Sequence, residues 1–438
     1  MDFTYDDEQQ ALREAVRGLL ATAYADHEAR RRTVADDPGF DRALWGRLAE
    51  MGVLGLPFSE ADGGVGAGPV EIGIVCQELG RVLAPEPYLS GVVHAGGLVA
   101  AVGTAEQKAD LLGRLSAGEV LLAAADTSPG DRWTSDADGV RASVADCTWT
   151  LDGVADPVMG GASADHLVVT AALPDGGTGV FVVDATAAKV TGYAAADLTR
   201  AATVRFEGSE ATPLGEPGRD LSASIATISD LTRIMGANQA LGVMQSQVRA
   251  TTDYLKSRKQ FGVTLNTFQA LTFRAADMYV SLELAHSTVD WATMTIAGGD
   301  REVVADAADR VGLQVGRAAR HIGQEAIQLH GGIGMPAEYA VGDGETSGIH
   351  MGLGTLLMIV NIVFIWLYTL SCHSCRHIVG GRLRHFSRHP VRYRLWTWVS
   401  RLNESHGKWA WYSLFSVAIV DLYIFLLATH TIQDVRFF

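Results

Sequence analysis

The sequence predicts a mainly α-helical protein with a central β module, followed by a two-helix transmembrane hairpin. Long helical patterns lie on both sides of a stretch of short β-branched runs, and the net charge changes sign along the chain. Residues 1–340 carry 26 Lys and Arg against 45 Asp and Glu, a net charge of −19, whereas residues 341–438 carry 9 against 5, a net charge of +4. This division indicates two parts that are suited to different solvents.

The acidic part predicts three domains. Residues 1–118 are rich in Ala, Leu, Arg and Glu at helical spacing, which indicates an N-terminal helical domain. Residues 119–221 contain short runs such as "DHLVVTA", separated by Gly, Asp and Pro, and these predict an antiparallel β-barrel or sandwich. In residues 222–341 apolar side chains recur every three or four positions over long stretches, which predicts an antiparallel helical bundle.

The basic part, residues 345–438, predicts the membrane hairpin. Its first span, at about 351–371, contains no charged residue and is long enough to cross a hydrocarbon core of ~30 Å at ~1.5 Å per residue. The second span, at about 409–429, is similarly apolar but contains Asp421. The loop between them, residues 376–408, carries seven Arg and one Lys against one Glu, which predicts a cytoplasmic location for the loop.

Composition also excludes some classes of function. The acidic part has no cluster of Lys and Arg of the kind that phosphate contacts need, so we expect no nucleic-acid partner. The N-terminal stretch lacks the basic and apolar regions of a signal peptide, and four cysteines are too few for a disulfide framework. We therefore expect residues 1–340 in the cytoplasm, and the C-terminal segment in the inner membrane if it is a genuine part of the protein.

Two segments carry a family resemblance: "DYLKSRKQFGVTLNTFQALTFRAADM" at 253–278 and "AIQLHGGIGMPAEY" at 326–339. Together with "YDDEQQALREAVRGLLA", "GLPFSEADGGVGAG" and "CQELGRVLAPEPYL", they resemble the acyl-CoA dehydrogenase family, flavoenzymes that oxidise the Cα–Cβ bond of an acyl thioester. The resemblance covers nearly all of residues 1–341. It implies FAD as cofactor, an acyl-CoA substrate, an electron-transfer flavoprotein or quinone as electron acceptor, and a homo- or hetero-oligomer.

The chemistry of the two segments suits a flavin dinucleotide. A pyrophosphate is bound well by a fixed bidentate cation, which Arg258 can supply, and glycines let backbone amides approach a cofactor closely. By the family pattern, the residues on the FAD side are Arg258, Gln260, Phe261, Gln269, Gln328, Gly331 and Gly332, several of them contacting the FAD of a neighbouring subunit. The alternative is that Arg258 is a solvated charge at a helix end and that the glycines only terminate a helix.

The catalytic base is harder to place. Thioester oxidation needs a carboxylate that removes the α-proton while hydride leaves Cβ. At the usual place in the family the chain continues into the first predicted membrane span, and at the second place Thr232 stands where a Glu is expected. Asp230 is then the candidate base, with a solvated acid at a helix start as the alternative. The flavin-binding strand motif of the family is reduced to fragments in "AAADTSPGD", 123–131, so the resemblance also allows a degenerate partner subunit.

A dense group of potential metal ligands follows the first predicted span. The stretch "SCHSCRHIVGGRLRHFSRH", 371–389, contains two cysteines and four histidines. Two thiolates with two imidazoles suit a tetrahedral metal or a Rieske-like iron–sulfur cluster. The nearest candidate ligands are Cys372, His373, Cys375 and His377. The alternative is a set of juxtamembrane His and Arg side chains that meet anionic lipid headgroups.

The basic part resembles a second family. The run from "GLGTLLMIVNIVFIWLYTLSCHSCRH" to "WAWYSLFSVAIVDLYIFL" is similar to the C-terminal half of the membrane-anchor subunit of an actinobacterial succinate dehydrogenase, which implies electron transfer toward quinone. Three functions therefore stay open: an acyl-CoA dehydrogenase, a membrane-anchor electron-transfer subunit, or a natural fusion of the two. A chimeric junction of two unrelated reading frames, at about Val341 to Glu345, would also explain the change of character.

Overall fold

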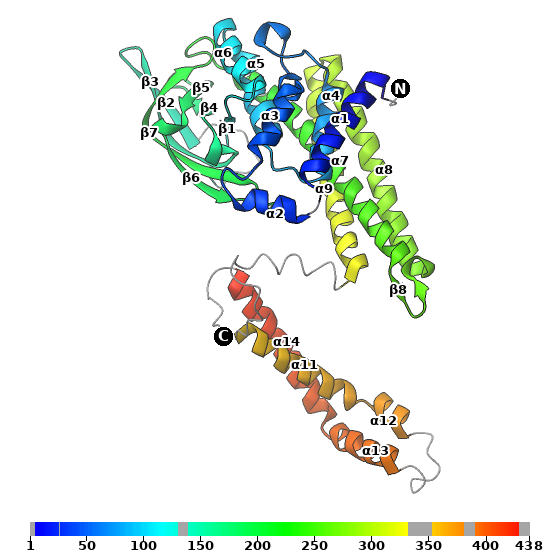
Figure 1. Cartoon of the computed structure of the whole chain (residues 1–438). Coiled ribbons are helices and arrows are strands. Elements are labelled where there is room, and N and C mark those ends of the chain that lie inside the picture. Colours follow the sequence, from blue (N-terminus) through cyan, green and yellow to red (C-terminus); the bar gives the residue numbers. More distant parts are fainter. Residues whose placement is uncertain (1–4, 26, 130–138, 332–352, 381–389, 429–438) are drawn as a thin grey trace. The chain divides into compact units, whose positions relative to one another are not determined.

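The computed structural model describes residues 5–25, 27–129, 139–331, 353–380 and 390–428 (Figure 1). The chain divides into two units, Met1–Tyr339 and Ala340–Phe438, and each is considered by itself.

The first unit begins with a helical layer. Its helices are α1 (Asp7–Ala23), α2 (His27–Ala35), α3 (Arg42–Glu50), α4 (Pro69–Arg81), the π-helical η3 (Tyr88–Gly96), α5 (Gly97–Val102) and α6 (Ala105–Ser116). Two of them start with a capping box. Asp6 accepts from the backbone N–H of Gln9, whose side chain reaches back to Asp6, and Thr104 and Gln107 do the same at α6. These local bonds satisfy donors that a helix start would otherwise leave unpaired.

Seven strands follow and lie together on one side of the unit (Figure 1). They are β1 (Leu122–Ala125), β2 (Val140–Ala145), β3 (Thr148–Met159), β4 (His166–Ala172), β5 (Thr178–Asp184), β6 (Lys189–Ala194) and β7 (Arg200–Pro213). The sheet order is β1-β4-β2-β3-β7-β5, and β5 also pairs with β4, so five strands close into a ring. The β module is therefore a small barrel, closed between β2 and β4 by a single residue pair.

The prediction of a purely antiparallel module was wrong for two strand pairs. β1 pairs with β4 in parallel, with Leu122 opposite His166, and the single β2–β4 contact is also parallel. Parallel neighbours need a long connection. The β2–β3 hairpin lies between β1 and β4 in the sequence and supplies that length.

β4 is buried on both of its faces. Leu167, Val169 and Ala171 belong to the core inside the barrel, whereas Val168 packs into the helical core. Its sequence is therefore mostly apolar and shows no alternation of apolar and polar residues, and Thr170 is buried with the rest. This strand joins the barrel to the helical layer.

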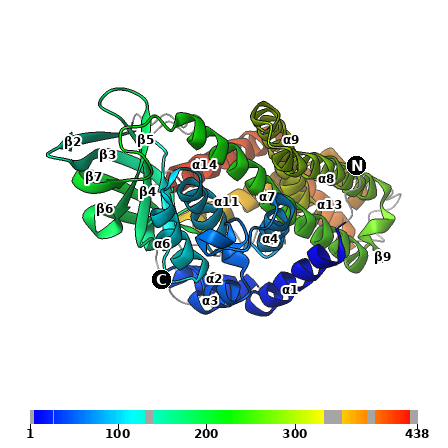
Figure 2. The same cartoon turned by 90° about the horizontal axis from the view of Figure 1, so that it is seen from above.

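A helical bundle completes the first unit. It consists of α7 (Ser222–Ser257), α8 (Gln269–Gly298) and α9 (Arg301–His330), and the short hairpin of β8 (Lys259–Gln260) and β9 (Val263–Thr264) joins α7 to α8. The three helices lie side by side (Figure 2). Buried residues recur along α9 at helical spacing, from Val304 through Val311 to Ile322, as the periodicity of the sequence predicts.

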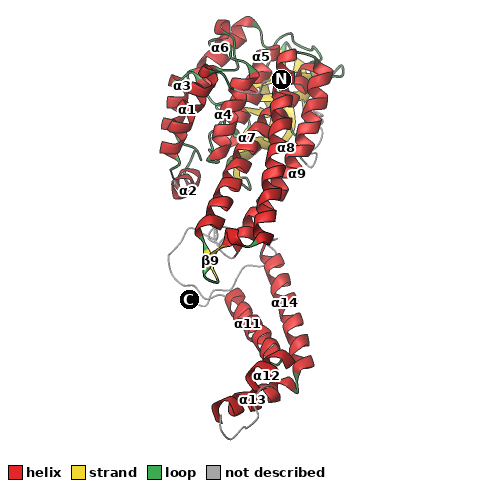
Figure 3. Ribbon diagram, turned by 90° about the vertical axis from the view of Figure 1, so that its right-hand side faces the viewer, coloured by secondary structure: helices red, strands yellow, loops and turns green. Residues whose placement is uncertain are grey.

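The second unit is helical in its described part. It contains α11 (Leu353–Leu370), α12 (His373–Gly380), α13 (Pro390–Asn403) and α14 (His406–Ala428) (Figure 3). α11 packs against α14, and the Ser416 hydroxyl donates a hydrogen bond of 2.7 Å to Asn361 Oδ1 across this contact. Among the described residues, none of the helices is both long and apolar enough to cross a membrane. The transmembrane hairpin expected at 351–371 and 409–429 is thus not confirmed and stays a prediction.

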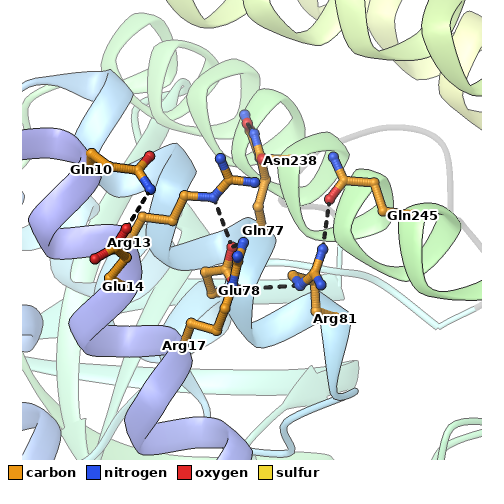
Figure 4. Close-up of polar contacts among 9 residues, drawn as sticks. All are labelled: Gln10, Arg13, Glu14, Arg17, Gln77, Glu78, Arg81, Asn238 and Gln245. Carbon is orange, nitrogen blue, oxygen red and sulfur yellow. Dashed lines mark hydrogen bonds and ion pairs between the residues drawn. The ribbon is translucent and has the colours of Figure 1, made fainter. Parts of the chain in front are cut away.

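In the first unit α4 and α7 approach each other unusually closely. A Cβ added to Gly80 would lie 2.0 Å from the carbonyl oxygen of Gln239, and one added to Gly242 would lie 2.0 Å from that of Gln77. Both residues sit inside helices, where glycine otherwise costs stability. The glycines are therefore explained by the close helix contact. A buried hydrogen bond of 2.9 Å from Gln77 Nε2 to Asn238 Oδ1 spans the same contact (Figure 4).

A buried carboxylate fixes α1 to the same pair of helices. The Glu78 side chain is 2% exposed and accepts from Arg17 at 2.7 and 2.8 Å, with Arg13 at 3.2 Å and Arg81 at 3.4 Å (Figure 4). Three guanidinium groups thus offset the cost of removing this carboxylate from water. Arg81 also donates to Gln245 of α7.

We predict that Gly242→Ala lowers the free energy of unfolding of the first unit by about 3 kcal/mol, because the added methyl group forces α4 and α7 apart. The matched control is Gly18→Ala in α1, where a Cβ meets nothing within 4 Å. That change should stabilise the helix by roughly 0.5–1 kcal/mol. Thermal unfolding of the full chain checks both. Equal stability of the two variants would contradict the close contact.

Candidate active site

A cavity of about 330 Å³ lies between the helical layer, the barrel and α7. Its wall includes Gly39 from the α2–α3 connection, Met159 at the end of β3, and Thr199 from the connection between β6 and β7. α7 contributes Thr232 and Gln239. A volume of this size is at the lower end of the range for small-molecule sites.

Glu86 is the most unusual group in the cavity wall. The residue is 6% exposed, and its Oε1 accepts a 2.5 Å hydrogen bond from the Tyr24 hydroxyl and a longer one of 3.3 Å from the backbone N–H of Asp41. The other carboxyl oxygen, Oε2, is buried and has no hydrogen-bond partner among the described residues. Burial raises the pKa of Glu86 from 4.5 to about 7, against the opposing effect of the hydrogen bond from Tyr24. Near neutral pH the carboxyl group is thus divided between its acid and ionised forms.

A second titratable pair adjoins the cavity where β1 ends. His94 Nε2 lies 3.0 Å from Asp126 Oδ2. Burial lowers the pKa of His94, but the charge and hydrogen bond of Asp126 outweigh it, and the net shift is upward. Burial raises the pKa of Asp126, and the partnership with His94 reverses this to a net lowering. Both shifts favour an imidazolium–carboxylate pair, which fixes η3 to the end of β1.

The predicted base, Asp230, lies on α7, where an arginine side chain binds its carboxylate. Its buried carboxylate forms an ion pair with Arg233, which also donates to Asp309 of α9 at 2.8 Å. Two residues along the helix, Thr232 lines the cavity, and its hydroxyl donates to the backbone carbonyl of Ile228. Of these two residues of α7, Thr232 and not Asp230 is thus in the cavity wall.

The predicted flavin-side residues gather at one end of the helical bundle. Arg258 caps the C-terminus of α7, Gln260 and Phe261 follow in the hairpin, and Gln269 begins α8. Gln328 and Gly331 lie at the end of α9, where the His330 ring stacks on Tyr254 of α7 with 4.5 Å between centroids. Gly332 lies outside the described residues.

The described flavin-side residues are all exposed. Phe261 is 93% exposed at a φ of 53°, Gly331 has a φ of 62°, and Arg258 forms no ion pair with the residues that the structure describes. An uncommitted guanidinium, several amide donors and a glycine in the left-handed region fit a dinucleotide pyrophosphate. These hydrogen-bond donors therefore suit FAD. Because they are exposed, a second protein surface is needed to cover the other side of the bound dinucleotide.

Comparison with known proteins now identifies the family. Residues 6–119 match the family model described as the N-terminal domain of acyl-CoA dehydrogenase, and residues 223–345 match its C-terminal domain. The acyl-CoA dehydrogenase IpdE2 of Mycobacterium tuberculosis is 30% identical over 353 residues, which cover 77% of this chain and 89% of the relative. The chain belongs to the acyl-CoA dehydrogenase family. Family membership supports FAD as its cofactor.

Solved structures agree with this assignment. A variant of the Tcur3481–Tcur3483 steroid ACAD is similar with a TM-score of 0.69 and 30% identity, covering 76% of this chain and 89% of that one. The ChsE4–ChsE5 complex of Mycobacterium tuberculosis is similar with a TM-score of 0.68 and 27% identity, and the match covers 76% of this chain and 89% of that one. The acyl-CoA dehydrogenase-like, mostly helical fold expected from the sequence is thereby confirmed for the first unit.

The second unit matches a different family. Residues 336–430 match the model described as actinobacterial succinate dehydrogenase subunit SdhC. The two-part resemblance of the sequence is thus confirmed. Residues 336–345 fall within both this match and that to the acyl-CoA dehydrogenase C-terminal domain.

The predicted metal site finds no support. Cys372 and Cys375 are half-buried, and the side chains of His373 and His377 lie outside the described ones. Among the residues that the structure describes, no three His, Cys, Asp or Glu side chains are grouped to hold a metal ion. The Rieske-like cluster stays a prediction.

Sequence reasoning missed Glu86 and the His94–Asp126 pair. The segment "LAPEPYLS" indicates a helix break, but nothing local marks its glutamate as buried. The one available signal is a glutamate between two prolines within an apolar stretch, where a charged side chain is unexpected.

We predict that the stability of the protein depends on pH through Glu86. The pKa of Glu86 is higher in the folded state, at about 7, than its unperturbed value of 4.5, so the folded state binds the proton more tightly. The free energy of unfolding therefore falls as pH rises between these two values. Between about pH 4 and pH 8 the unfolding free energy should fall by about 3 kcal/mol more in the wild type than in Glu86→Gln. Denaturant titrations of both proteins check this. Parallel pH profiles would contradict the raised pKa.

Proposed function

We propose that residues 1–339 act as an FAD-binding partner subunit of an acyl-CoA dehydrogenase complex that oxidises the Cα–Cβ bond of an acyl-CoA thioester. When bound, FAD supplies the hydride acceptor. The observation that carries the proposal is that α7 offers Thr232 to the cavity, while Asp230 is held by Arg233. The base that removes the α-proton then comes from another subunit.

The ion pair of Asp230 commits its carboxylate to another side chain. A general base must come within hydrogen-bond reach of the proton that it removes. The Asp230 carboxylate instead contacts Arg233, which also forms an ion pair with Asp309 of α9 and so ties α7 to α9. Asp230 therefore serves helix packing in this proposal.

The exposure of the flavin-side residues supports an oligomer. Arg258, Gln260 and Phe261 project from the end of the bundle, and α8 also exposes Phe273, Tyr279 and Leu284, each more than half exposed. An apolar helix face next to a dinucleotide site is suited to a second subunit that covers both. Two similar structures, Tcur3481–Tcur3483 and the ChsE4–ChsE5 complex, are each named for two different chains. The electron acceptor would be an electron-transfer flavoprotein or a quinone.

We predict that Arg258→Gln lowers the FAD content of the purified complex at least about tenfold, because the pyrophosphate loses a charge-assisted bidentate contact. The matched control is Arg249→Gln, which removes another exposed arginine of α7 and should leave FAD content unchanged. The absorbance of bound flavin per protein measures both.

The partner-subunit role is tested by activity. The full chain purified without a second acyl-CoA dehydrogenase chain should show no flavin reduction by acyl-CoA, whereas the complex isolated from native cells should show it. Turnover by the chain alone would contradict the proposal, and so would an active complex that contains no second chain of this family.

A second candidate function concerns residues 340–438, for which we propose association with a membrane. Trp366 and Ile362 of α11 and Leu414, Phe415 and Ile419 of α14 are each more than half exposed. Such an apolar surface is costly in water and is covered in stable proteins by lipid or by another chain. This supports the anchor-type function that the SdhC match implies for that family.

We predict that the full chain floats with liposomes and that Trp366→Glu together with Leu414→Glu abolishes flotation, because two charges enter the lipid-facing surface. The matched control, Met51→Glu with Val65→Glu, places the same charges on exposed apolar positions of the first unit and should not affect flotation. Resistance of the bound protein to alkaline extraction would favour spanning helices over peripheral binding. Failure of the wild type to float would contradict membrane association.

A junction of two reading frames is the alternative to one natural chain. It is supported by the overlap of the two family matches at 336–345, without a polar linker between them. Mass spectrometry of native cells separates the two accounts: a peptide that spans Ala340 to Met351 establishes one chain, and detection of both halves only as separate proteins establishes the junction.

A further inference from the structure

The two carboxyl oxygens of Glu86, a residue of the cavity wall, differ in their hydrogen bonds. Its Oε1 already has the Tyr24 hydroxyl and the Asp41 amide, and both contacts would be equally available to a glutamine or to any other oxygen acceptor. Its Oε2 is buried without a partner among the described residues. Burying a polar oxygen without a hydrogen bond is costly, so such groups are usually satisfied by a bound molecule or by water.

The Glu86 carboxyl group also forms no direct ion pair with the described residues. Arg30 lies nearby and is buried, but its guanidinium donates to the carbonyl oxygens of Leu83 and Asp197. In the described part of the chain Glu86 therefore takes part in no ion pair, in contrast to Glu78, which is surrounded by three arginines. If Glu86 served only to hold the structure together, a neutral side chain of similar shape would do so without the free-energy cost of burying a carboxylate.

The position of Glu86 separates it from the reacting end of the site. Glu86 precedes the π-helical segment that carries His94, and seven residues lie between the two. His94 forms an ion pair with Asp126 at the end of β1. Because the resemblance places the flavin at the end of β1, His94 and Asp126 mark the flavin side of the cavity, and Glu86 belongs to another part of its wall.

A second unsatisfied atom lies in the same wall. The Arg200 guanidinium bonds the Ala35 carbonyl and the Asp37 carboxylate through Nη2, while its Nε is buried without a hydrogen bond among the described residues. The cavity thus has an unpaired donor as well as a carboxyl oxygen. An unsubstituted hydrocarbon chain could satisfy neither of them.

We propose that this cavity selects an acyl-CoA whose acyl chain carries a hydroxyl or oxo group, and that the Oε2 oxygen of Glu86 hydrogen-bonds that substituent. The inference rests on the proposed function, since it names the substrate class of the same site. With its pKa raised to about 7, the carboxyl group can donate to an oxo oxygen in its acid form and accept from a hydroxyl in its ionised form. A carboxylate substituent is disfavoured by repulsion from the ionised form.

The test measures binding by equilibrium dialysis with the purified complex of the full chain and its partner subunit, with FAD bound. The probes are an unsubstituted medium-chain acyl-CoA and esters of the same length that carry a hydroxyl, oxo or carboxylate group at successive carbons beyond the reacting pair. At one substituted position the hydroxy or oxo ester should bind about tenfold more tightly than the unsubstituted ester. The carboxylate ester should show no such gain.

Two variants separate recognition from structure. Glu86→Leu should remove the preference by weakening the substituted ester to the level of the unsubstituted one. Tyr24→Phe breaks the same internal hydrogen bond and leaves Oε2 in place, so it should keep the preference even if stability falls.

Each contrary result has a distinct meaning. If no ester binds at all, the proposed function fails together with the inference. If all esters bind equally to the wild type, or if Glu86→Leu weakens every ester by the same factor, only the inference is overturned. Loss of flavin reduction in Glu86→Gln with unchanged binding would assign Glu86 to proton transfer and would also overturn it.

Discussion

The close contact between α4 and α7 is the constraint on which the rest of the first unit depends. Gly80 and Gly242 let the two backbones approach to distances that no Cβ would allow, and Gln77 and Asn238 hydrogen-bond where they cross. The chain that leaves α4 runs directly into the segment that carries Glu86, while α7 carries Thr232 and Gln239 into the same cavity. The width of the cavity is therefore set by a helix contact outside it. Asn238 also contacts a third helix, because its amide nitrogen donates a hydrogen bond to the Thr293 hydroxyl of α8. The same residue therefore links α4, α7 and α8.

Two buried glutamates in this unit show how differently the same side chain is used. Glu78 is surrounded by arginines from α1 and α4, so its charge is compensated and contributes to packing (Figure 4). Glu86 has hydrogen bonds to one oxygen only, and burial raises its pKa to about 7. Compensated charge fixes helices, whereas uncompensated charge at a cavity is typical of ligand recognition or catalysis. Asp230 belongs to the first kind, because Arg233 holds it.

The two units meet different physical demands. The first unit buries its large apolar side chains in one helical core and one barrel core, and Glu86 and Arg200 in its cavity wall each have a buried polar atom without a partner among the described residues. The described helices of the second unit expose apolar side chains along α11 and α14, and they share a polar contact between Asn361 and Ser416. A sheltered polar contact between apolar helices is typical of helix pairs whose outer surface is covered by lipid or protein. The change in net charge near residue 340 follows the same division.

The sequence by itself determined the features that depend on local spacing. Apolar periodicity placed the long helices, the glycine-rich turn and "SRKQFG" pointed to the family, and Arg258, Gln260 and Gln269 lie together because they follow one another around a single hairpin. Only the tertiary structure decided the parallel pairing of β1 with β4, the ion pair of Asp230, and the cavity around Glu86. Tyr24 and Glu86 are 62 positions apart, and His94 meets Asp126 across two different elements. Periodicity reports which face of an element is buried, but the partner of a buried polar group depends on which distant segments the fold brings together.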